Sequence, residues 1–158
     1  MSKKGGSSGG GGGGKGKKPI FEYIETEDIE GVRAELEKSV ETLETRNKDG
    51  FTPLITAAYI GNIDILNLIL SKGGNPTAVC KDGDTPLHYS CAQGHLECMA
   101  TLGSLRQVNL LATDNDGETP MDVCENSKAK KMLEKLIKKR EEEDERGDVE
   151  GEEEEEEE

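Results

Sequence analysis

The fold of this 158-residue chain is indicated by residues 49–70, DGFTPLITAAYIGNIDILNLIL. The stretch opens with the turn pair Asp-Gly, passes through an apolar segment, breaks at Gly61 and becomes apolar again. Asp-Gly suits a tight turn because glycine tolerates positive φ. The two apolar segments predict two short helices, and neither is long enough to be stable alone. Both helices therefore need neighbours to pack against.

The same pattern occurs twice more along the chain. DGDTPLHYSCAQGHLECMATL begins at residue 82 and DGETPMDVCENSKAKKMLEKLI begins at residue 116. The Thr-Pro pairs of the three stretches are spaced by 33 and then 34 residues. A period of this size indicates an array of stacked units, in which each unit covers the apolar face of the next.

Each unit carries signals for a turn, a helix, a second turn and a second helix. Thr52, Thr85 and Thr119 stand at N-cap positions, where a hydroxyl accepts a hydrogen bond from a backbone N–H that has no helical partner. The proline that follows suits the first helical turn, because its missing N–H needs no partner there. Gly61 and Gly94 are expected to end the first helices.

Two stretches resemble the ankyrin-repeat signature, which has a 33-residue period and a T-P-L-H-x-A pattern. They are TPLHYSCAQGH, residues 85–95, and DGFTPLITAAYIGN, residues 49–62. The resemblance covers residues 19–140 and implies an all-α solenoid of stacked helix-turn-helix units with turn or hairpin tips. It implies four repeats, the outer two being degenerate caps, at about residues 19–48, 49–81, 82–115 and 116–140.

Two departures from the signature affect the expected structure. Ile55 and Asp122 stand where the signature has the histidine found at His88, which the resemblance predicts to hydrogen-bond turn backbone. SLRQVNLLATD, residues 104–114, carries an extra residue, so the loop after the third repeat is expected to be irregular.

Composition separates two tails from the repeats. Residues 1–18 hold nine of the twenty glycines and five lysines, whereas residues 141–158 hold fourteen acids and one arginine. Neither tail has enough apolar surface to offset the entropy of ordering, so both are predicted to be disordered.

The chain has no long apolar run and no secretory segment, which predicts an intracellular protein, cytoplasmic or nuclear. Its four cysteines are then expected to be small apolar side chains in packed helices.

His88, Cys91, His95 and Cys98 are the one set with the residue types of a zinc site. Their spacings of 3, 4 and 3 residues would align them on a single continuous helix. Gly94 interrupts that helix, so we interpret the four residues as structural and expect no metal and no cofactor. The sequence contains no arguable nucleophile–base pair or phosphate-binding loop, and we expect no enzymatic activity.

Lys128–Arg140, KAKKMLEKLIKKR, is a basic amphipathic stretch with seven basic residues in thirteen. Its apolar stripe predicts a helix that closes the stack and leaves a solvated outer face. A nucleic-acid surface is the alternative. The adjoining acidic run and the net charge of −14 argue against that alternative, because both repel phosphate.

The resemblance implies a concave binding face formed by turn tips and first helices. Phe51 and Tyr59 are expected to be exposed anchors there, because aromatic residues dominate binding hot spots; the alternative for Tyr59 is packing between helices. The candidate protein-binding residues are, at the tips, Lys48, Asp49, Phe51, Lys81, Asp82, Asp84, Asn115, Asp116 and Glu118, and, on the first helices, Tyr59, Ile60, Ala92 and Gln93.

These features predict a non-catalytic protein–protein interaction module that is a monomer when free. The leading hypothesis is a module that binds or escorts a basic protein through its concave face and acidic tail. In architecture it resembles small acidic-tailed ankyrin proteins that escort basic clients such as ribosomal proteins. A structural adaptor or subunit of a larger assembly, with the tails as solvating spacers, is the alternative. No small-molecule substrate, nucleic acid or membrane partner is expected.

Overall fold

The computed structural model describes residues 19–146, so the disorder predicted for residues 1–18 and 147–158 lies outside the described residues. Helices form the whole of the regular structure in this part of the chain, which contains no β-strand. In chain order they are α1 (Ile20–Glu25), α2 (Ile29–Lys38), the 3-10 helix η1 (Val40–Glu44), α3 (Pro53–Ile60), α4 (Ile63–Ser71), α5 (Pro86–Gln93), α6 (Leu96–Gly103), α7 (Pro120–Val123) and α8 (Ser127–Glu145).

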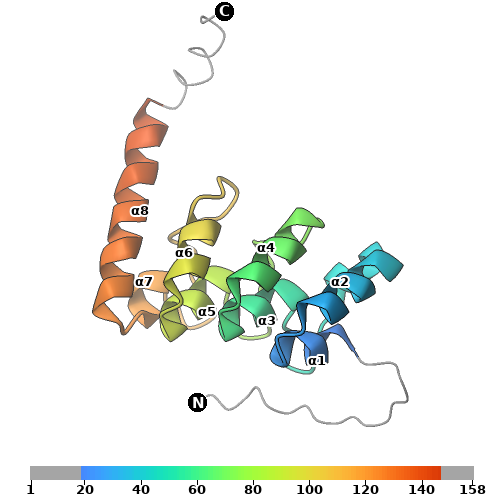
Figure 1. Ribbon diagram of the computed structural model, residues 1–158. Coiled ribbons are helices and arrows are strands. Elements are labelled where there is room, and N and C mark those ends of the chain that lie inside the picture. Colours follow the sequence, from blue (N-terminus) through green and yellow to red (C-terminus); the bar gives the residue numbers. More distant parts are fainter. Residues whose placement is uncertain (1–18, 147–158) are drawn as a thin grey trace, which may run out of the picture.

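The helices stack in two rows, as Figure 1 shows. The inner row consists of α1, α3, α5 and α7, and each of these helices packs against the next. The outer row consists of α2, α4, α6 and α8, which contact one another in the same order. Because every helix pair packs on its neighbours, the fold is the predicted all-α solenoid.

The predicted helix signals are confirmed. Thr52, Thr85 and Thr119 each accept a hydrogen bond on Oγ1 from the backbone N–H three residues later, at 3.2 Å in every case. Gly61 and Gly94 follow α3 and α5 with φ of 89° and 75°. This left-handed conformation favours glycine and allows the chain to reverse into the outer helix.

His88 joins its own helix to the next hairpin. Its Nδ1 accepts a hydrogen bond from the Thr85 backbone N–H at 3.1 Å, which leaves Nε2 to donate to the Glu118 carbonyl at 2.9 Å. This pairing places an imidazole proton on Nε2. Asp122 makes only the first of these contacts, accepting from the Thr119 N–H at 2.9 Å, and the side chain of Ile55 is simply buried.

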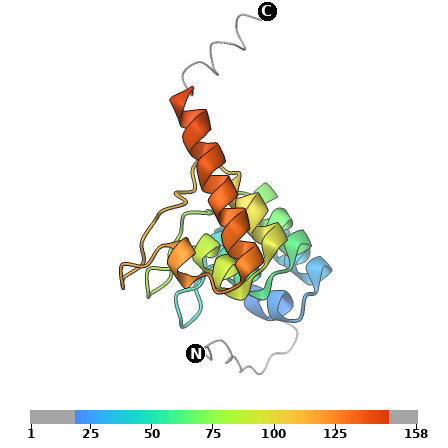
Figure 2. The same cartoon turned by 90° about the vertical axis from the view of Figure 1, so that its left-hand side faces the viewer.

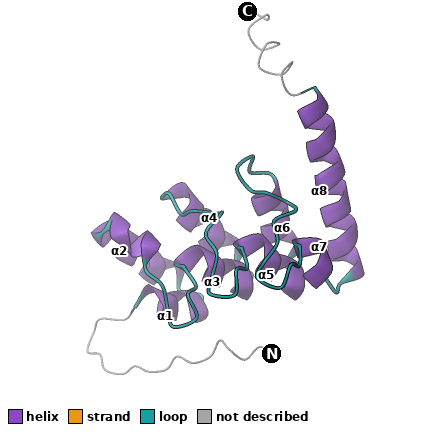
Figure 3. Ribbon diagram, turned by 180° about the vertical axis from the view of Figure 1, so that it is seen from behind, coloured by secondary structure: helices purple, strands orange, loops and turns teal. Residues whose placement is uncertain are grey.

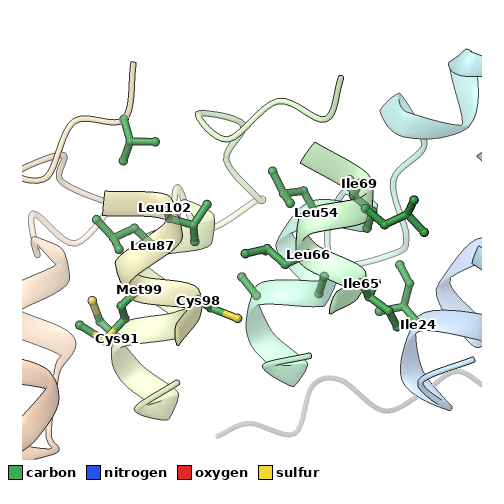
Figure 4. Packing of buried hydrophobic residues seen from close by; sticks show 14 of the residues in the cluster. Ile24, Leu54, Ile65, Leu66, Ile69, Leu87, Cys91, Cys98, Met99 and Leu102 are labelled. Carbon is green, nitrogen blue, oxygen red and sulfur yellow. The ribbon is translucent and has the colours of Figure 1, made fainter. Parts of the chain in front are cut away.

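Apolar side chains fill the space between the rows, as Figure 4 shows. Leu54, Leu66, Leu87 and Leu102 are all buried, and together they link the second and third helix pairs into one core. The predicted burial of the cysteines is confirmed, and their thiols are free. Cys91 and Cys98 lie in packed helices as predicted, whereas Cys80 lies in a hairpin and Cys124 directly follows α7.

The last helix corrects the expected boundary at Arg140. Helix α8 continues to Glu145, so the first five residues of the predicted disordered tail are helical. Arg106, in the irregular loop, pairs with Glu143 at 3.3 Å and Asp144 at 2.8 Å, and Lys139 pairs with Glu143 at 3.1 Å. These ion pairs neutralise part of the acidic run and favour its helical form.

Arg140 fixes α8 to the rest of the stack. Its guanidinium donates to the backbone carbonyls of Val108, Gly103 and Leu105 at 2.8–2.9 Å. Gly103 ends α6, and Leu105 and Val108 belong to the irregular loop after the third repeat, where the Leu105 carbonyl also accepts from the Val108 N–H at 3.0 Å. One side chain thereby satisfies three backbone acceptors.

We expect Arg140→Ala to destabilise the fold by about 2 kcal/mol, because three carbonyls lose charge-assisted hydrogen bonds. Arg140→Lys is not expected to restore the loss, since an ammonium group lacks the planar fork of the guanidinium. Lys139→Ala is the matched control and should cost roughly 0.5 kcal/mol or less, because its ion pair is exposed. Urea unfolding of the three variants tests this ranking, and equal losses for Arg140→Ala and Lys139→Ala would contradict it.

Candidate interaction groove

A groove runs along the side of the stack to which the hairpin tips project, as Figure 2 shows for the tips. Six of the residues that line the groove are acidic, and the lining contains no Lys or Arg. The lining residues, which define the groove below, are Phe51, Tyr59, Asp82, Asp84, His88, Tyr89, Ala92, Gln93, Asp114, Asp116, Glu118, Val123 and Glu125.

Backbone hydrogen bonds shape the tips that form one wall of the groove. The second tip closes through the Cys80 N–H and the Asp84 carbonyl at 3.0 Å, and the third through the Asp114 N–H and the Glu118 carbonyl at 2.9 Å. The Asn115 N–H then donates to the Asp82 carbonyl at 3.0 Å, which joins the two tips. Figure 3 shows these loops side by side along the stack. Carboxylate oxygens of Asp84 and Asp114 lie within 4.8 Å of each other.

Three aromatic rings line part of the groove, and we call them its floor. The ring centroids of Phe51, Tyr59 and Tyr89 lie 5.0–6.1 Å apart, with the two tyrosines edge to face. Phe51 is only 5% exposed, so its predicted exposure is wrong: it packs with Ile55, Ala78 and Cys80 beneath the hairpin. The tyrosines are half-buried and line the groove.

Tyr89 is a groove residue that the sequence prediction missed. It occupies the variable position of the T-P-L-H-x-A pattern, directly after His88. A position that the repeat does not need for its own packing is a sequence signal for a recognition residue. The Tyr89 hydroxyl lies 3.3 Å from the Cys80 thiol, which holds the ring in place.

Asp84 and Asp114 form a carboxyl pair in the lining of the groove. Partial burial, followed by the hydrogen bond and charge of Asp114, raises the pKa of Asp84 to about 7. Burial also acts to raise the pKa of Asp114. The backbone N–H groups of Glu118 and Asp116, each 2.9 Å from its Oδ1, and the Asp84 carboxyl nevertheless hold this pKa below its usual value. Below about pH 7 the pair therefore shares one proton, held mainly on Asp84.

Asp84, His88 and Asp114 bring possible metal-ligand atoms within 4.8 Å of one another. Both nitrogens of His88 are already hydrogen-bonded, however, so its imidazole has no lone pair to offer. The other three residues with the types of a zinc site are also held by the fold. His95 Nε2 lies 3.0 Å from the Tyr59 carbonyl, and Cys91 and Cys98 are in the main core. The four residues do not share one face.

Eight of the thirteen predicted site residues line the groove: Phe51, Tyr59, Asp82, Asp84, Ala92, Gln93, Asp116 and Glu118. The other five lie elsewhere. Lys81 and Asn115 connect adjacent tips, Lys48 and Asp49 belong to the first tip, and Ile60 packs against the main core. The groove residues absent from the prediction are His88, Tyr89, Asp114, Val123 and Glu125.

Stacked helix pairs with hairpin tips along one side define a solenoid repeat protein with an extended concave surface. The sequence profile of ankyrin repeats, in three copies, matches residues 61–146. The chain belongs to the ankyrin-repeat family. Ankyrin repeats are protein–protein interaction modules and are generally not enzymes, so a protein partner is indicated.

Several curated proteins are similar to this chain. BCL-6 corepressor-like protein 1 of Homo sapiens is 33% identical over 98 residues, which are 62% of this chain and 5% of that protein. Putative ankyrin repeat protein FPV222 of Fowlpox virus is 41% identical over 69 residues, 44% of this chain and 9% of the viral protein. Ankyrin repeat-containing protein P1E11.10 of Schizosaccharomyces pombe is 36% identical over 69 residues, 44% of this chain and 33% of its own length. The match thus covers at most a third of these relatives.

No helix within residues 19–146 combines the length and apolar character needed to cross a bilayer.

The carboxyl pair predicts a pH-dependent stability. Because the pKa of Asp84 is raised, ionisation of this group opposes folding; its favourable contribution is complete below about pH 4 and is lost as pH rises through about 7. We therefore expect Asp84→Asn to gain stability relative to the wild type between pH 5.5 and 8.5. Urea unfolding across this range measures the difference. Glu44→Gln, an exposed acid outside the groove, is the control and should show a constant difference.

Proposed function

We propose that the chain binds a basic protein, through a Lys- and Arg-rich segment that lies in the groove. The observation that carries this proposal is the charge of the lining: six carboxyl groups and no cationic side chain among thirteen residues. Such a surface attracts cationic segments and disfavours acidic ones. It also leaves unfavourable mutual repulsion between carboxylates, which a cationic partner relieves.

The groove offers two kinds of contact to a basic side chain. Asp82, Asp116 and Glu118 are exposed on the tips, where they can pair with Lys or Arg and raise the association rate. Tyr59 and Tyr89 lie on the floor nearby and provide ring surface against which a guanidinium can stack. Charge on the wall and aromatic surface on the floor favour arginine in particular.

The acidic tail supports the same proposal from the sequence. Residues 141–158 contribute fourteen acids and one arginine, which enlarge the negative field around the stack. A basic client held by both groove and tail would have its charge masked from other polyanions, which is what an escort requires. A tail that acts only as a solubiliser would leave the client's affinity unchanged when its charge is removed.

The test uses a fluorescent peptide of ten alternating Arg and Lys residues as the probe, at 50 and 300 mM NaCl. We expect the combined variant Asp82→Asn, Asp116→Asn and Glu118→Gln to weaken binding at least tenfold at low salt. Glu37→Gln, Glu41→Gln and Glu44→Gln together remove the same charge from exposed positions outside the groove and should weaken it less than threefold. Similar losses in both variants would show that only the overall charge matters.

Salt dependence separates the proposal from the adaptor alternative. Binding of a basic segment to exposed carboxylates should weaken strongly between 50 and 300 mM NaCl, because counterions screen such contacts. The same titration with proteins captured from the cell identifies a natural partner. An interface of a larger assembly that depends on apolar contacts would retain its affinity at high salt.

Binding should also release protons near neutral pH. A cation placed beside Asp84 lowers the pKa of this carboxyl from about 7, so the shared proton is lost when the peptide binds. Calorimetric titration at pH 7 in two buffers with different ionisation enthalpies measures the number of protons released. We expect the release to be abolished in Asp84→Asn, and an equal release in this variant would remove Asp84 from the contact.

A further inference from the structure

Helix α8 carries a row of lysines on the side that faces away from the stack. Lys128, Lys131, Lys135 and Lys138 are spaced by 3, 4 and 3 residues, which aligns them on one face of a helix. All four are exposed. We name these four residues the lysine row.

The opposite face of α8 packs on the stack. Ala129 and Leu133 are buried there, and Met132, Leu136 and Ile137 pack against the same core. Figures 1 and 2 show α8 at the end of the stack, extending beyond the other helices. The lysine row therefore lies on an end face that no further repeat covers within the described residues.

The lysine row makes no ion pair within residues 19–146. No carboxylate of this part of the chain lies within ion-pair distance of any of its four ammonium groups, whereas the neighbouring Lys139 pairs with Glu143. Like charges three and four residues apart destabilise a helix. A row of four therefore favours any anionic segment that can align with it.

The chain itself supplies an anionic segment of suitable length. Residues 147–158 hold nine acids and no basic residue, and their last seven residues are all Glu. Twelve extended residues span about 40 Å, and the eighteen helical rises from Lys128 to Arg146 span about 27 Å. Gly147 follows Arg146 and allows the chain to reverse there. The segment can therefore reach the whole lysine row.

Covalent attachment favours this segment over an external polyanion. A short tether gives a local concentration in the millimolar range, which compensates for the weakness of each exposed ion pair. An external nucleic acid has to displace the tethered segment before it reaches the lysines.

We propose that residues 148–158 bind the lysine row of the same chain and thereby close this face of α8 to external polyanions, nucleic acids included. The inference does not rest on the proposed function, because no residue of the lysine row lines the groove, but both proposals use the acidic tail. As a consequence, the C-terminal segment of the chain controls whether external polyanions can bind to this basic surface.

The first test locates the segment by NMR in the full-length chain. Each glutamate of residues 152–158 is replaced by glutamine, and the amide and side-chain signals of the lysine row are compared with those of the wild type at 50 mM NaCl. We expect shifts confined to α8 that disappear at 500 mM NaCl. Unchanged signals in α8 would overturn the proposal. Shifts that depend on protein concentration would also overturn it, by placing the segment on a second copy.

The second test measures binding of a fluorescent 15-base-pair DNA duplex at 50 mM NaCl. The glutamine variant of residues 152–158 should bind at least tenfold more tightly than the wild type. Adding Lys131→Gln, Lys135→Gln and Lys138→Gln should abolish this gain, with circular dichroism confirming that α8 remains helical. The control is Glu37→Gln, Glu41→Gln and Glu44→Gln, which lowers net negative charge elsewhere. A gain that persists without the lysines would show that the segment acts only through overall charge, and would overturn the proposal.

Discussion

The stacking of one inner helix on the next stabilises every repeat of this fold. Helices α3 and α5 each have eight residues, and α7 has four, so none of them would be stable in isolation. Each becomes stable only when its neighbours remove its apolar face from water. The hydrogen bond from His88 to the Glu118 carbonyl fixes the register of this stacking, because it joins a helix to the hairpin of the following repeat.

The same register determines the chemistry of the groove. Joining one tip to the next aligns the carboxylates of successive hairpins at short separation, so that their charges interact instead of remaining independent. Asp84 shows the result, with a pKa raised to about 7 in a pair with Asp114. A surface of this kind is not produced by one repeat, because its acidic groups come from two tips and the floor from two helices.

Local signals were sufficient to predict the repeating part of the fold, whereas long-range contacts were not predictable. The threonine caps and the glycines that end helices depend on nearby atoms, and the structure agrees with the sequence there. The burial of Phe51 depends on Ala78 and Cys80, about thirty residues away, which fold over its ring. The extension of α8 past Arg140 likewise depends on Arg106. For the groove, the acidic tips followed from the repeat pattern, but the pairing of Asp114 with Asp84 joins two tips, and no local signal in the sequence indicates such a contact.

The buried thiols allow local opening of the stack to be measured by chemical modification. Burial raises the pKa of Cys91, Cys98 and Cys124, so these side chains remain as thiols, which are poor nucleophiles. An alkylating reagent reaches them only when the surrounding helices separate. Because Cys98 lies in an outer helix and Cys124 directly follows α7, their rates of modification report the separate opening of the middle and the end of the solenoid. The amino acids that complete the core therefore also make its local stability measurable, residue by residue, without an added label.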